Sequence, residues 1–596
     1  MNGLKLPTGK YLADILEFLP SGKIIFKFDT GCGATYAELV ARRHSLLIEP
    51  YIPVILGKSN EKVLAVYGNI TVTDIIKYFQ LELEYFKIVS TPEGLSKIIE
   101  AAEELKIDIR NSFFLLIDEC EKLIQDVGFR PRIVEAMDEF FLFKNRSFIS
   151  ATPIQPTDPR FKEEEFENFY IFPETKKLIP INLRNTNSIA STIKDYFNKN
   201  RSEQYLIFIN STERIAAIIE FLNIKDESQI FCSKESADKL KINGIMNSKE
   251  LFRVCDMRKY NFFTSRFFTA FDMILNNKPN VLIVSDVMKT PHSALDPNTD
   301  IIQIVGRARK GVCDITHISN SNPHLISKSP TEVLEFLNGS KEAYLAIKAL
   351  RDTTNKIGAF DVLDEALRLV KFSTFINKHD DSINHFMLDQ EVYDNRIKGY
   401  YQSSENLIKA YEESERFDVT ARNEVYNLDD AKIDKLKKGI SEKEVMTVVC
   451  EAFEAGFTDA EHCYNLAPNR ALYQLIETHN LKYKYYHTLG IDKIRELEYN
   501  PGKIRDAYDK HLMLNSPDFF RLLLSLKLVF KRKKRATGKS IGKILRFYFR
   551  KYHIRLKPTV TQLSYWFEVD PKKRVTIGYE ADGKEVKGYE IGRCRV

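Results

Sequence analysis

Residues 28–39, FDTGCGATYAEL, contain the residue types of a phosphate-binding loop. A strand-like run, Lys23–Phe28, leads into a glycine-containing turn, and a helix-like run, Tyr36–Val40, follows the turn. In such loops, backbone N–H groups at the start of a helix point at phosphates, a lysine binds the terminal phosphates and a hydroxyl binds Mg²⁺. Here the hydroxyl is present and the lysine is absent. The candidate loop residues are Gly31, Cys32, Gly33, Ala34 and Thr35.

Two carboxylates, Asp118 and Glu119, directly follow the apolar run Phe113–Ile117. A run without polar residues is typical of a central parallel strand. A carboxylate at the carboxyl end of such a strand lies at the ligand-binding edge of an α/β sheet. Asp118 could therefore hold Mg²⁺, and Glu119 could orient an attacking water. The structural alternative is a charged turn between a strand and a helix.

Four further segments complete an ordered series of short motifs. They are Thr91-Pro92-Glu93, Ser150-Ala151-Thr152, the stretch TSRFFTAFD from Thr264 to Asp272, and the stretch QIVGRARK from Gln303 to Lys310. Each segment alone is unspecific, and the last one could simply be the basic start of a helix. The series is more specific than its members, because the segments follow one another in this order and lie at the ends of expected strands.

This series resembles the motifs of superfamily 2 helicases, the DEAD/DEAH-like and Dicer-like enzymes. The resemblance implies two RecA-like lobes that bind ATP and Mg²⁺ between them, with Thr35 and Asp118 at the metal. It also implies that Thr91, Pro92 and Thr264 contact nucleic acid and that Asp272 lies near the ribose. The match around Asp272 is loose, because Thr269-Ala270 stands where Arg-Gly is usual. Gln303, Gly306, Arg307 and Arg309 belong to the motif whose arginines reach the terminal phosphate, where a guanidinium suits developing charge.

The missing lysine leaves three interpretations open. Hydrolysis could survive if Lys23, Lys27 or Lys58 supplied the positive charge from another direction. Nucleotide could instead bind without turnover, since a lost charge-assisted contact removes roughly 1.5–3 kcal/mol. The lobes could also be a scaffold that only grips nucleic acid. The phrase TGCGAT is similar to motif I of a helicase-like group on mobile elements and phages of gut bacteria, which favours a specialised function over decay.

The elements that must position these motifs alternate between strands and helices, which indicates parallel α/β sheets. In the first lobe, residues 1–182, we expect strands at Lys23–Phe28, Ser45–Glu49, Val63–Tyr67, Tyr85–Val89, Phe113–Ile117 and Arg146–Ile149. In the second lobe, residues 183–330, we expect strands at Tyr205–Ile209, Ile230–Cys232, Tyr260–Phe263, Val281–Val284 and Ile301–Val305. A helical accessory region, 331–516, and a basic C-terminal module, 517–596, follow.

The basic module is set apart by its charge. From Arg521 to the end there are about 21 Lys and Arg against about 6 Asp and Glu, although the whole chain carries only +6. Such a segment is typical of a surface that meets a polyanion. Our candidate nucleic-acid contacts in it are Lys531, Arg532, Lys533, Lys534, Arg535, Arg550 and Lys551.

The expected elements of this module resemble a winged helix. Helices are expected at Ile541–Tyr552 and Val560–Phe567, and strands at Val575–Tyr579 and Val586–Ile591 around an Asp-Gly hairpin turn. Leu545, Phe549 and Tyr552 share one helical face and should be core. A winged helix puts one helix into the major groove and basic residues on phosphates. The alternative is a basic α/β cap without specific groove recognition.

Composition excludes some other classes of protein. No apolar run reaches the about 18 residues of a membrane span, and residues 1–7 lack the apolar core of a secretion signal. We therefore expect a cytoplasmic protein whose eight scattered cysteines are reduced.

Taken together, the sequence predicts a nucleotide-dependent DNA helicase or translocase that acts in the DNA replication of a mobile element or phage. Its expected partners are single-stranded or duplex DNA and other replication proteins, and no membrane. The alternative is a catalytically inactive helicase scaffold that serves as a DNA-binding or replication-initiation factor.

Overall fold

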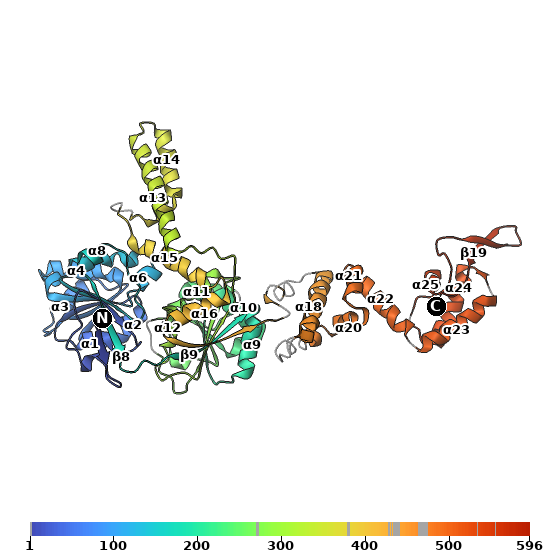
Figure 1. Cartoon of the computed structure of the whole chain (residues 1–596), viewed down its shortest axis with the longest axis horizontal. Coiled ribbons are helices and arrows are strands. Elements are labelled where there is room, and N and C mark those ends of the chain that lie inside the picture. The colour runs from blue at the N-terminus through green and yellow to red at the C-terminus, as the bar shows by residue number, and fades with distance from the viewer. Residues whose placement is uncertain are drawn as a thin grey trace. The chain divides into compact units, whose positions relative to one another are not determined.

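The computed structural model describes residues 3–595 except 243, 270–272, 378–381, 427–428, 431, 433–440, 463–471, 473–474, 516, 533 and 555. The chain forms two compact units, Met1–Val425 and Tyr426–Val596. Figure 1 shows the first unit as two sheet-containing lobes, coloured blue and green, with α13 and α14 as a helical hairpin (Figure 1).

The first lobe is built on an eight-stranded parallel sheet with strand order β1-β8-β2-β7-β6-β3-β5-β4. Six strands coincide with the predicted ones to within about two residues, and β1 and β8 were not predicted. The strands are β1 (Gly3–Leu6), β2 (Lys23–Lys27), β3 (His44–Ile48), β4 (Val63–Val66), β5 (Lys87–Ser90), β6 (Phe113–Asp118), β7 (Asn145–Ser150) and β8 (Glu167–Pro173).

Helices cover both faces of this sheet, because successive strand residues point to opposite faces. Leu116 packs in the cluster that contains α1 and α2, whereas Leu115 packs in the cluster that contains α3, α4, α6 and α7. The helices are α1 (Ala34–Val40), α2 (Ile52–Lys58), α3 (Val72–Phe79), α4 (Leu95–Glu104), α5 (Ile109–Ser112), α6 (Lys122–Gln125), α7 (Ala136–Leu142) and α8 (Arg160–Glu163). A parallel sheet that is covered on both faces favours strands such as Phe113–Ile117, which is apolar throughout.

The second lobe contains another eight-stranded parallel sheet, in the order β12-β11-β13-β10-β14-β15-β9-β16. Its strands are β9 (Ile179–Thr186), β10 (Tyr205–Phe208), β11 (Ser228–Phe231), β12 (Ser248–Lys249), β13 (Tyr260–Phe263), β14 (Asn280–Ser285), β15 (Asp314–Ser319) and β16 (Phe417–Glu424). Helices α9 (Ile189–Lys199), α10 (Thr212–Leu222) and α11 (Lys234–Ile242) cover one face, and α12 (Asp300–Val305), α15 (His385–Tyr400) and α16 (Ser404–Glu413) pack on the other. The prediction of two parallel-sheet lobes is confirmed.

One predicted strand of this lobe is wrong. The segment Ile301–Val305 belongs to the helix α12. A five-residue run with one polar residue, Gln303, fits a buried helix as well as a strand, so its periodicity could not decide between them. The strand of this region is β15, which follows the helix.

Residues beyond 330 also contribute to the second lobe. Strand β16 pairs in parallel with β9 from Phe417 opposite Ile179 to Glu424 opposite Thr186. A buried chain of hydrogen bonds ties α15 and α16 to this sheet. Tyr411 Oη lies 2.7 Å from His317 Nδ1, His317 Nε2 lies 3.0 Å from Ser285 Oγ, and Ser285 Oγ lies 3.1 Å from Tyr401 Oη.

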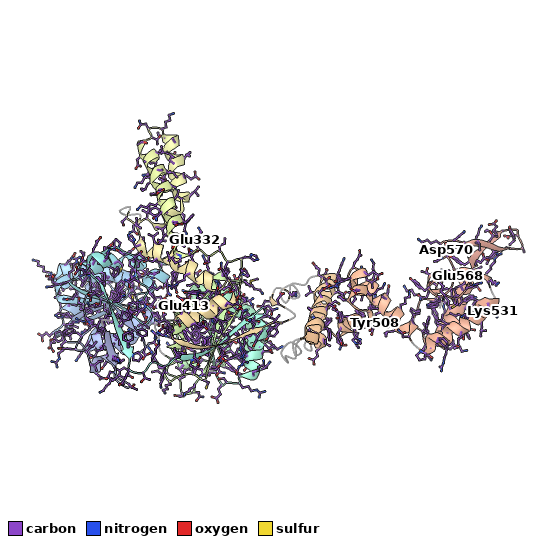
Figure 2. All side chains as sticks on the ribbon, viewed as in Figure 1. Glu332, Glu413, Tyr508, Lys531, Glu568 and Asp570 are labelled. Carbon is purple, nitrogen blue, oxygen red and sulfur yellow. The ribbon has the colours of Figure 1, made fainter. Side chains whose placement is uncertain are left out.

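The helices α13 (Pro330–Thr353) and α14 (Ile357–Leu369) form the hairpin of the first unit. At the start of α13, the Ser329 hydroxyl accepts a hydrogen bond from the Glu332 N–H, and the Glu332 carboxylate accepts one from the Ser329 N–H. Figure 2 labels Glu332 at the base of the hairpin. This reciprocal capping satisfies two N–H groups that the helix cannot pair itself, and it defines where α13 begins.

The second unit is helical at first and ends in a small antiparallel sheet. Its helices α18 (Glu442–His462), α20 (Asn480–Leu489), α21 (Ile491–Glu496) and α22 (Pro501–Leu514) precede the basic segment. That segment contains α23 (Pro517–Arg532), β17 (Arg535–Ala536), α24 (Gly538–Lys551), α25 (Val560–Ser564), β18 (Val575–Tyr579) and β19 (Glu585–Glu590). The sheet order is β17-β19-β18, and the buried Trp566 packs against rings of α23 and α24. The hairpin turns at Gly583, which has φ +85°.

Two expectations from composition can be compared with the described residues. No helix among them is long and apolar enough to cross a membrane. The seven cysteines that the structure describes are all free thiols.

The packing of α15, α16 and β16 predicts where a stable fragment can end. A fragment ending at Val425 should melt cooperatively, whereas one ending at Ser329 should not. The shorter fragment loses Tyr401 and Tyr411 from the core and leaves the buried His317 without a hydrogen-bond partner at Nδ1. Thermal melting by circular dichroism would check this, and equally cooperative melting of both fragments would contradict it.

Candidate functional site

The predicted phosphate-binding loop connects β2 to α1, and two of its glycines have backbone conformations that other residues rarely adopt. Gly31 has φ +85° and Gly33 has φ +81°. A Cβ atom on Gly31 would lie 2.4 Å from Nη1 of Arg309, so the glycine allows that guanidinium to approach the loop closely. A Cβ atom on Gly33 would lie 3.3 Å from the ring of Tyr11. Cys32 and Ala34 are buried.

The centre of the site is the carboxylate of Asp118, at the end of β6. Lys27, the last residue of β2, donates to Asp118 Oδ1 at 2.8 Å, and the Thr35 hydroxyl donates to Asp118 Oδ2 at 2.6 Å. Lys27 and Asp118 are both nearly fully buried. Lys27 therefore brings a positive charge to the carboxylate that the loop itself, with Ala34, cannot supply.

The electrostatics of this pair favour its ionised form. Burial opposes ionisation of Lys27, but the charges of Asp118 and Glu119 outweigh it and raise the pKa of Lys27 above its usual value. Burial likewise opposes ionisation of Asp118, but Lys27 and Lys58 lower the pKa of Asp118 to about 2. The site thus holds a charged carboxylate and a charged ammonium at neutral pH.

The second predicted carboxylate, Glu119, is held by residues of both lobes. Its Oε2 accepts hydrogen bonds from Ser150 Oγ at 3.1 Å and from Gln303 Nε2 at 2.8 Å. Ser150 ends β7 in the first lobe, and Gln303 lies in α12 of the second. Glu119 itself has φ +48°, an uncommon conformation for a residue with a side chain. A strained backbone that aims one carboxylate at the interface between lobes is a feature of functional sites.

Gly306, Arg307 and Arg309 follow Gln303 at the same interface. A Cβ atom on Gly306 would lie 2.1 Å from Thr30 Oγ1, so the end of α12 touches the phosphate-binding loop directly. Arg309 lies against Gly31 of that loop. Arg307 is buried, and it donates from Nε to the Gln303 carbonyl and from Nη2 to Gln303 Oε1, each at 2.8 Å. These contacts orient the Gln303 amide toward Glu119.

Glu121 extends this network and was not predicted. Its Oε1 accepts from Thr152 Oγ1 at 3.4 Å and from Gln303 Nε2 at 3.3 Å. Its Oε2 is buried without a hydrogen bond. Burial and the charge of Glu119 raise the pKa of Glu121 to about 8. A carboxyl group with an unsatisfied buried oxygen is costly when it is charged.

Arg416 is a further site residue that nothing in the sequence indicated. It lies just before β16, far along the chain, and its guanidinium donates to the carbonyls of Phe28 and Ala151. The same guanidinium lies 4.3 Å from the centre of the Phe28 ring. Burial lowers the pKa of Arg416 to about 10. The edge of the second lobe is thereby attached to the strand ends that carry the site.

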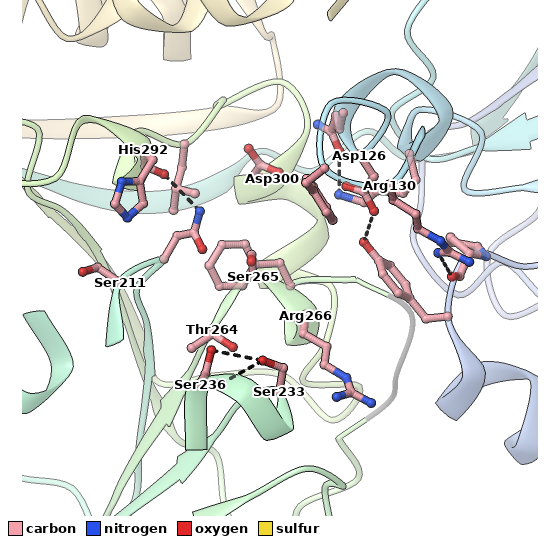
Figure 3. A pocket seen from close by; sticks show the side chains of 18 of the residues that line it. Asp126, Arg130, Ser211, Ser233, Ser236, Thr264, Ser265, Arg266, His292 and Asp300 are labelled. Carbon is pink, nitrogen blue, oxygen red and sulfur yellow. Dashed lines mark hydrogen bonds between the residues drawn. The ribbon is translucent and has the colours of Figure 1, made fainter. Parts of the chain in front are cut away.

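On another side of the lobe interface there is a cavity of about 850 Å³ (Figure 3). Thr91 lines it from the first lobe, and Thr264 and Arg266 line it from the second. Hydroxyl groups are frequent on its wall, including those of Ser211, Ser233, Ser236 and Ser265. Pro92 is buried next to Thr91, at the start of a short 3₁₀ helix. Asp272 lies outside the described residues.

The remaining predicted contacts belong to the second unit. Lys531 and Arg532 lie in α23, Lys534 and Arg535 follow it, and Arg550 and Lys551 end α24. Lys533 lies outside the described residues.

The residues present suit a nucleotide with Mg²⁺. A hard cation prefers oxygen ligands, and Asp118 and Thr35 offer a charged carboxylate and a hydroxyl at one point. Among the described residues, no group of three or more His, Cys, Asp or Glu could hold a metal ion. Mg²⁺ would therefore need phosphate oxygens and waters as its other ligands, as it does in nucleotide sites.

Comparisons with known proteins find similarity only at the level of solved structures. No protein-family model matches the chain, and no curated protein matches it either. Among solved structures, Dbp5 of S. cerevisiae bound to RNA and ADP BeF3 is 11% identical, with a TM-score of 0.33, covering 50% of this chain and 79% of that one. A DEAD box protein from the hyperthermophile Methanococcus jannaschii is 13% identical, with a TM-score of 0.27, covering 50% and 86%. At these values, the function must be argued from the residues of the site.

The buried Glu121 predicts a pH dependence of stability. A carboxyl group with a raised pKa destabilises the folded state increasingly as pH rises from its unfolded value, about 4.5, to about 8. At pH 8.5 the free energy of unfolding of Glu121→Gln should therefore exceed that of wild type by on the order of 1–3 kcal/mol, so the variant should melt at a higher temperature. The difference should shrink at pH 5. Calorimetry at both pH values would measure this.

The control is Glu104→Gln, which changes an exposed carboxylate on α4. A melting difference between Glu121→Gln and wild type that stays constant from pH 5 to pH 8.5 would refute the assignment.

Proposed function

We propose that this protein is a nucleotide-dependent helicase or translocase of the superfamily 2 type, acting on DNA. The observation that carries the proposal is the hydrogen bond from Gln303 of the second lobe to Glu119 of the first. This hydrogen bond connects Glu119, the carboxylate that would orient the attacking water, with the second lobe, which would move. Hydrolysis and lobe movement are then mechanically linked, which is what a motor requires.

Lys27 takes the part of the absent loop lysine in this proposal. Its ammonium reaches Asp118 from the strand that precedes the loop. When nucleotide binds, Lys27 can turn from Asp118 to a terminal phosphate, while Thr35 and Asp118 hold Mg²⁺. Bound Mg²⁺ would neutralise phosphate charge. The loop position of Ala34 then needs no lysine, because Lys27 supplies the positive charge from β2.

Glu119 and the arginines complete the chemistry. Glu119 orients the attacking water and accepts its proton, with its carboxylate fixed by Ser150 and Gln303. Arg309 lies over the loop at Gly31, close to where phosphates would bind, and can stabilise charge that develops on the transferred group. Arg307 supports the Gln303 amide and, as the lobes adjust, can join Arg309.

Nucleic acid would cross the interlobe cavity and be held by the basic module. The hydroxyls of Thr91 and Thr264 and the guanidinium of Arg266 line the cavity and suit a phosphate backbone. In the second unit, the order helix, strand, helix, helix and hairpin, with sheet order β17-β19-β18, supports a winged-helix-like module. We propose replication of a mobile element or phage as the setting, with other replication proteins as partners.

Phosphate release from ATP tests the proposal. Wild type should release phosphate, faster with single-stranded or duplex DNA, and an RNA arm tests the choice of DNA. Glu119→Gln should lower release by roughly 10²–10⁴-fold, as expected for loss of a general base. Lys27→Met should lower it by roughly 10²–10³-fold, as expected for loss of one stabilising charge.

Lys23→Met is the matched control, because Lys23 begins the same strand and pairs with Glu167 at 2.5 Å, away from Asp118. Asp118 and Lys27 are both buried, so the folding of Lys27→Met is checked by circular dichroism, and Lys27→Arg retains the charge. The proposed motor function would be refuted if Glu119→Gln released phosphate as fast as wild type, or if wild type released no phosphate under any condition.

The second candidate is a DNA-binding or replication-initiation factor on an inactive scaffold. The concentration of basic side chains after Arg521 favours it. Removing residues 517–596 separates the two functions. A motor should lose affinity for DNA but keep nucleotide hydrolysis, whereas a binding factor should lose DNA binding and have no hydrolysis to keep. Fluorescence anisotropy and phosphate release on the same fragment measure both.

A further inference from the structure

The outer face of α24 is a row of exposed basic side chains. Lys539, Lys543, Arg546 and Arg550 recur at intervals of three or four residues and are all exposed. The opposite face of the helix, with Ile541, Leu545 and Phe549, is buried in the core of the module. The helix contains no Asp or Glu. The spacing places all four cations on one face, where they reinforce one another's field.

An aromatic ring stands within this row. Phe547 is 62% exposed, and with Lys543, Arg546, Arg550 and Lys551 it lines a surface hollow of about 570 Å³. Its ring meets that of Tyr548 edge-on, with the centroids 5.0 Å apart, so one face of the ring is not used for packing in a stack. A single exposed aromatic residue is common on proteins. An exposed ring that lines one hollow together with four basic side chains is a more specific arrangement than a single exposed ring.

The charges of this hollow are not neutralised by ion pairs of the described residues. Those ion pairs that lie in the basic module join Arg521 to Asp518, Arg535 to Glu590 and Lys587 to Glu585. None involves Lys543, Arg546 or Arg550. The ammonium of Lys551 lies 5.3 Å from the ring of Tyr552, a contact that leaves its charge in place. The hollow is therefore suited to a polyanion.

The neighbouring helix α25 has a different composition. In the proposed winged-helix-like arrangement, it is the helix that would enter the major groove. Its residues Val560–Ser564 include no Lys or Arg, and the adjoining Tyr565 lies 4.4 Å below the ammonium of Lys510. The hairpin combines Lys584 and Lys587 with several carboxylates. Duplex binding through α25 would thus lack the phosphate contacts that α24 offers.

We propose that the outer face of α24 binds single-stranded nucleic acid, with one base stacked on Phe547 and the flanking phosphates held by Lys543, Arg546 and Arg550. Aromatic rings among basic side chains are the usual means of gripping single strands, because every base has a face that can stack. A base paired within a duplex has its faces covered and cannot use Phe547 in this way. The inference rests on the proposed function, and it specifies the form of the nucleic acid that the module takes.

Photocrosslinking of the full chain gives the direct test. The probe is a single-stranded oligo(dT) of about twelve nucleotides with one 5-iododeoxyuridine, irradiated without ATP and mapped by mass spectrometry. The expected crosslink lies on the peptide that contains Phe547. A crosslink confined to α25, to the hairpin or to the interlobe cavity would overturn the proposal.

Affinity measurements give the second test. Phe547→Ala in the full chain should weaken binding of the same oligonucleotide roughly 5- to 150-fold, the range expected for one lost stacking contact. Phe547→Trp should bind as well as wild type or better. The matched control is Phe520→Ala on α23, which removes a ring of similar exposure, 66%, outside the hollow. Equal losses for Phe547→Ala and Phe520→Ala would refute the stacking role.

Salt dependence tests the cations separately. Each of Lys543→Gln, Arg546→Gln and Arg550→Gln should reduce the slope of log affinity against log salt by about 0.7 for a single strand. A Phe547→Ala loss that is the same for a mixed-sequence duplex as for oligo(dT) would contradict the preference for single strands. The crosslinking and affinity measurements need no nucleotide. If the protein did not hydrolyse ATP, the crosslink to the peptide that contains Phe547 would still be expected. If that crosslink failed, ATP hydrolysis would be unaffected, so the two proposals fail independently.

Discussion

The buried ion pair between Lys27 and Asp118 is the constraint on which the site depends. A carboxylate out of contact with water is tolerated only when its partners offset the loss of hydration, and breaking such a pair typically costs about 3–5 kcal/mol. Asp118 has three partners: the Lys27 ammonium, the Thr35 hydroxyl and the Glu119 N–H. These contacts hold the ends of β2 and β6 and the start of α1 in one arrangement. Lys27 and Asp118 both stay charged, so a ligand that competes with the ion pair can bind either group.

Hydrogen bonds join the second lobe to this arrangement, in addition to the covalent connection through the chain. Gln303 reaches Glu119, and the Arg416 guanidinium reaches the carbonyls at the ends of β2 and β7. Tyr393 of α15 accepts from Gln125 of the first lobe at 2.6 Å and lies 2.7 Å from Thr299 Oγ1 of the second. Such polar contacts can be exchanged at lower cost than a packed apolar interface, so they would suit the lobe movement that the proposed function requires.

The two units use charge in different ways. In the first unit, opposite charges are buried in pairs and fix geometry, as Lys27 and Asp118 do. In the second unit, the cations of α24 are exposed and like-charged, so they contribute little to the fold and much to the surrounding field. The proposed function would need both properties, the buried pairs for chemistry and the exposed cations for binding nucleic acid.

The sequence by itself determined the elements whose apolar runs are unambiguous. Strand β6 is buried at every position, so its composition, and with it the place of Asp118 at the strand end, could be predicted. The loop glycines and the hairpin at Gly583 were equally readable, because their backbone conformations favour glycine. The tertiary structure alone decided which of the three candidate lysines contacts Asp118, since Lys23, Lys27 and Lys58 differ only in where their strands and helices place them. It also decided the contacts of Arg416, Glu121 and β16, because contacts between residues far apart in the chain leave no periodicity in the sequence.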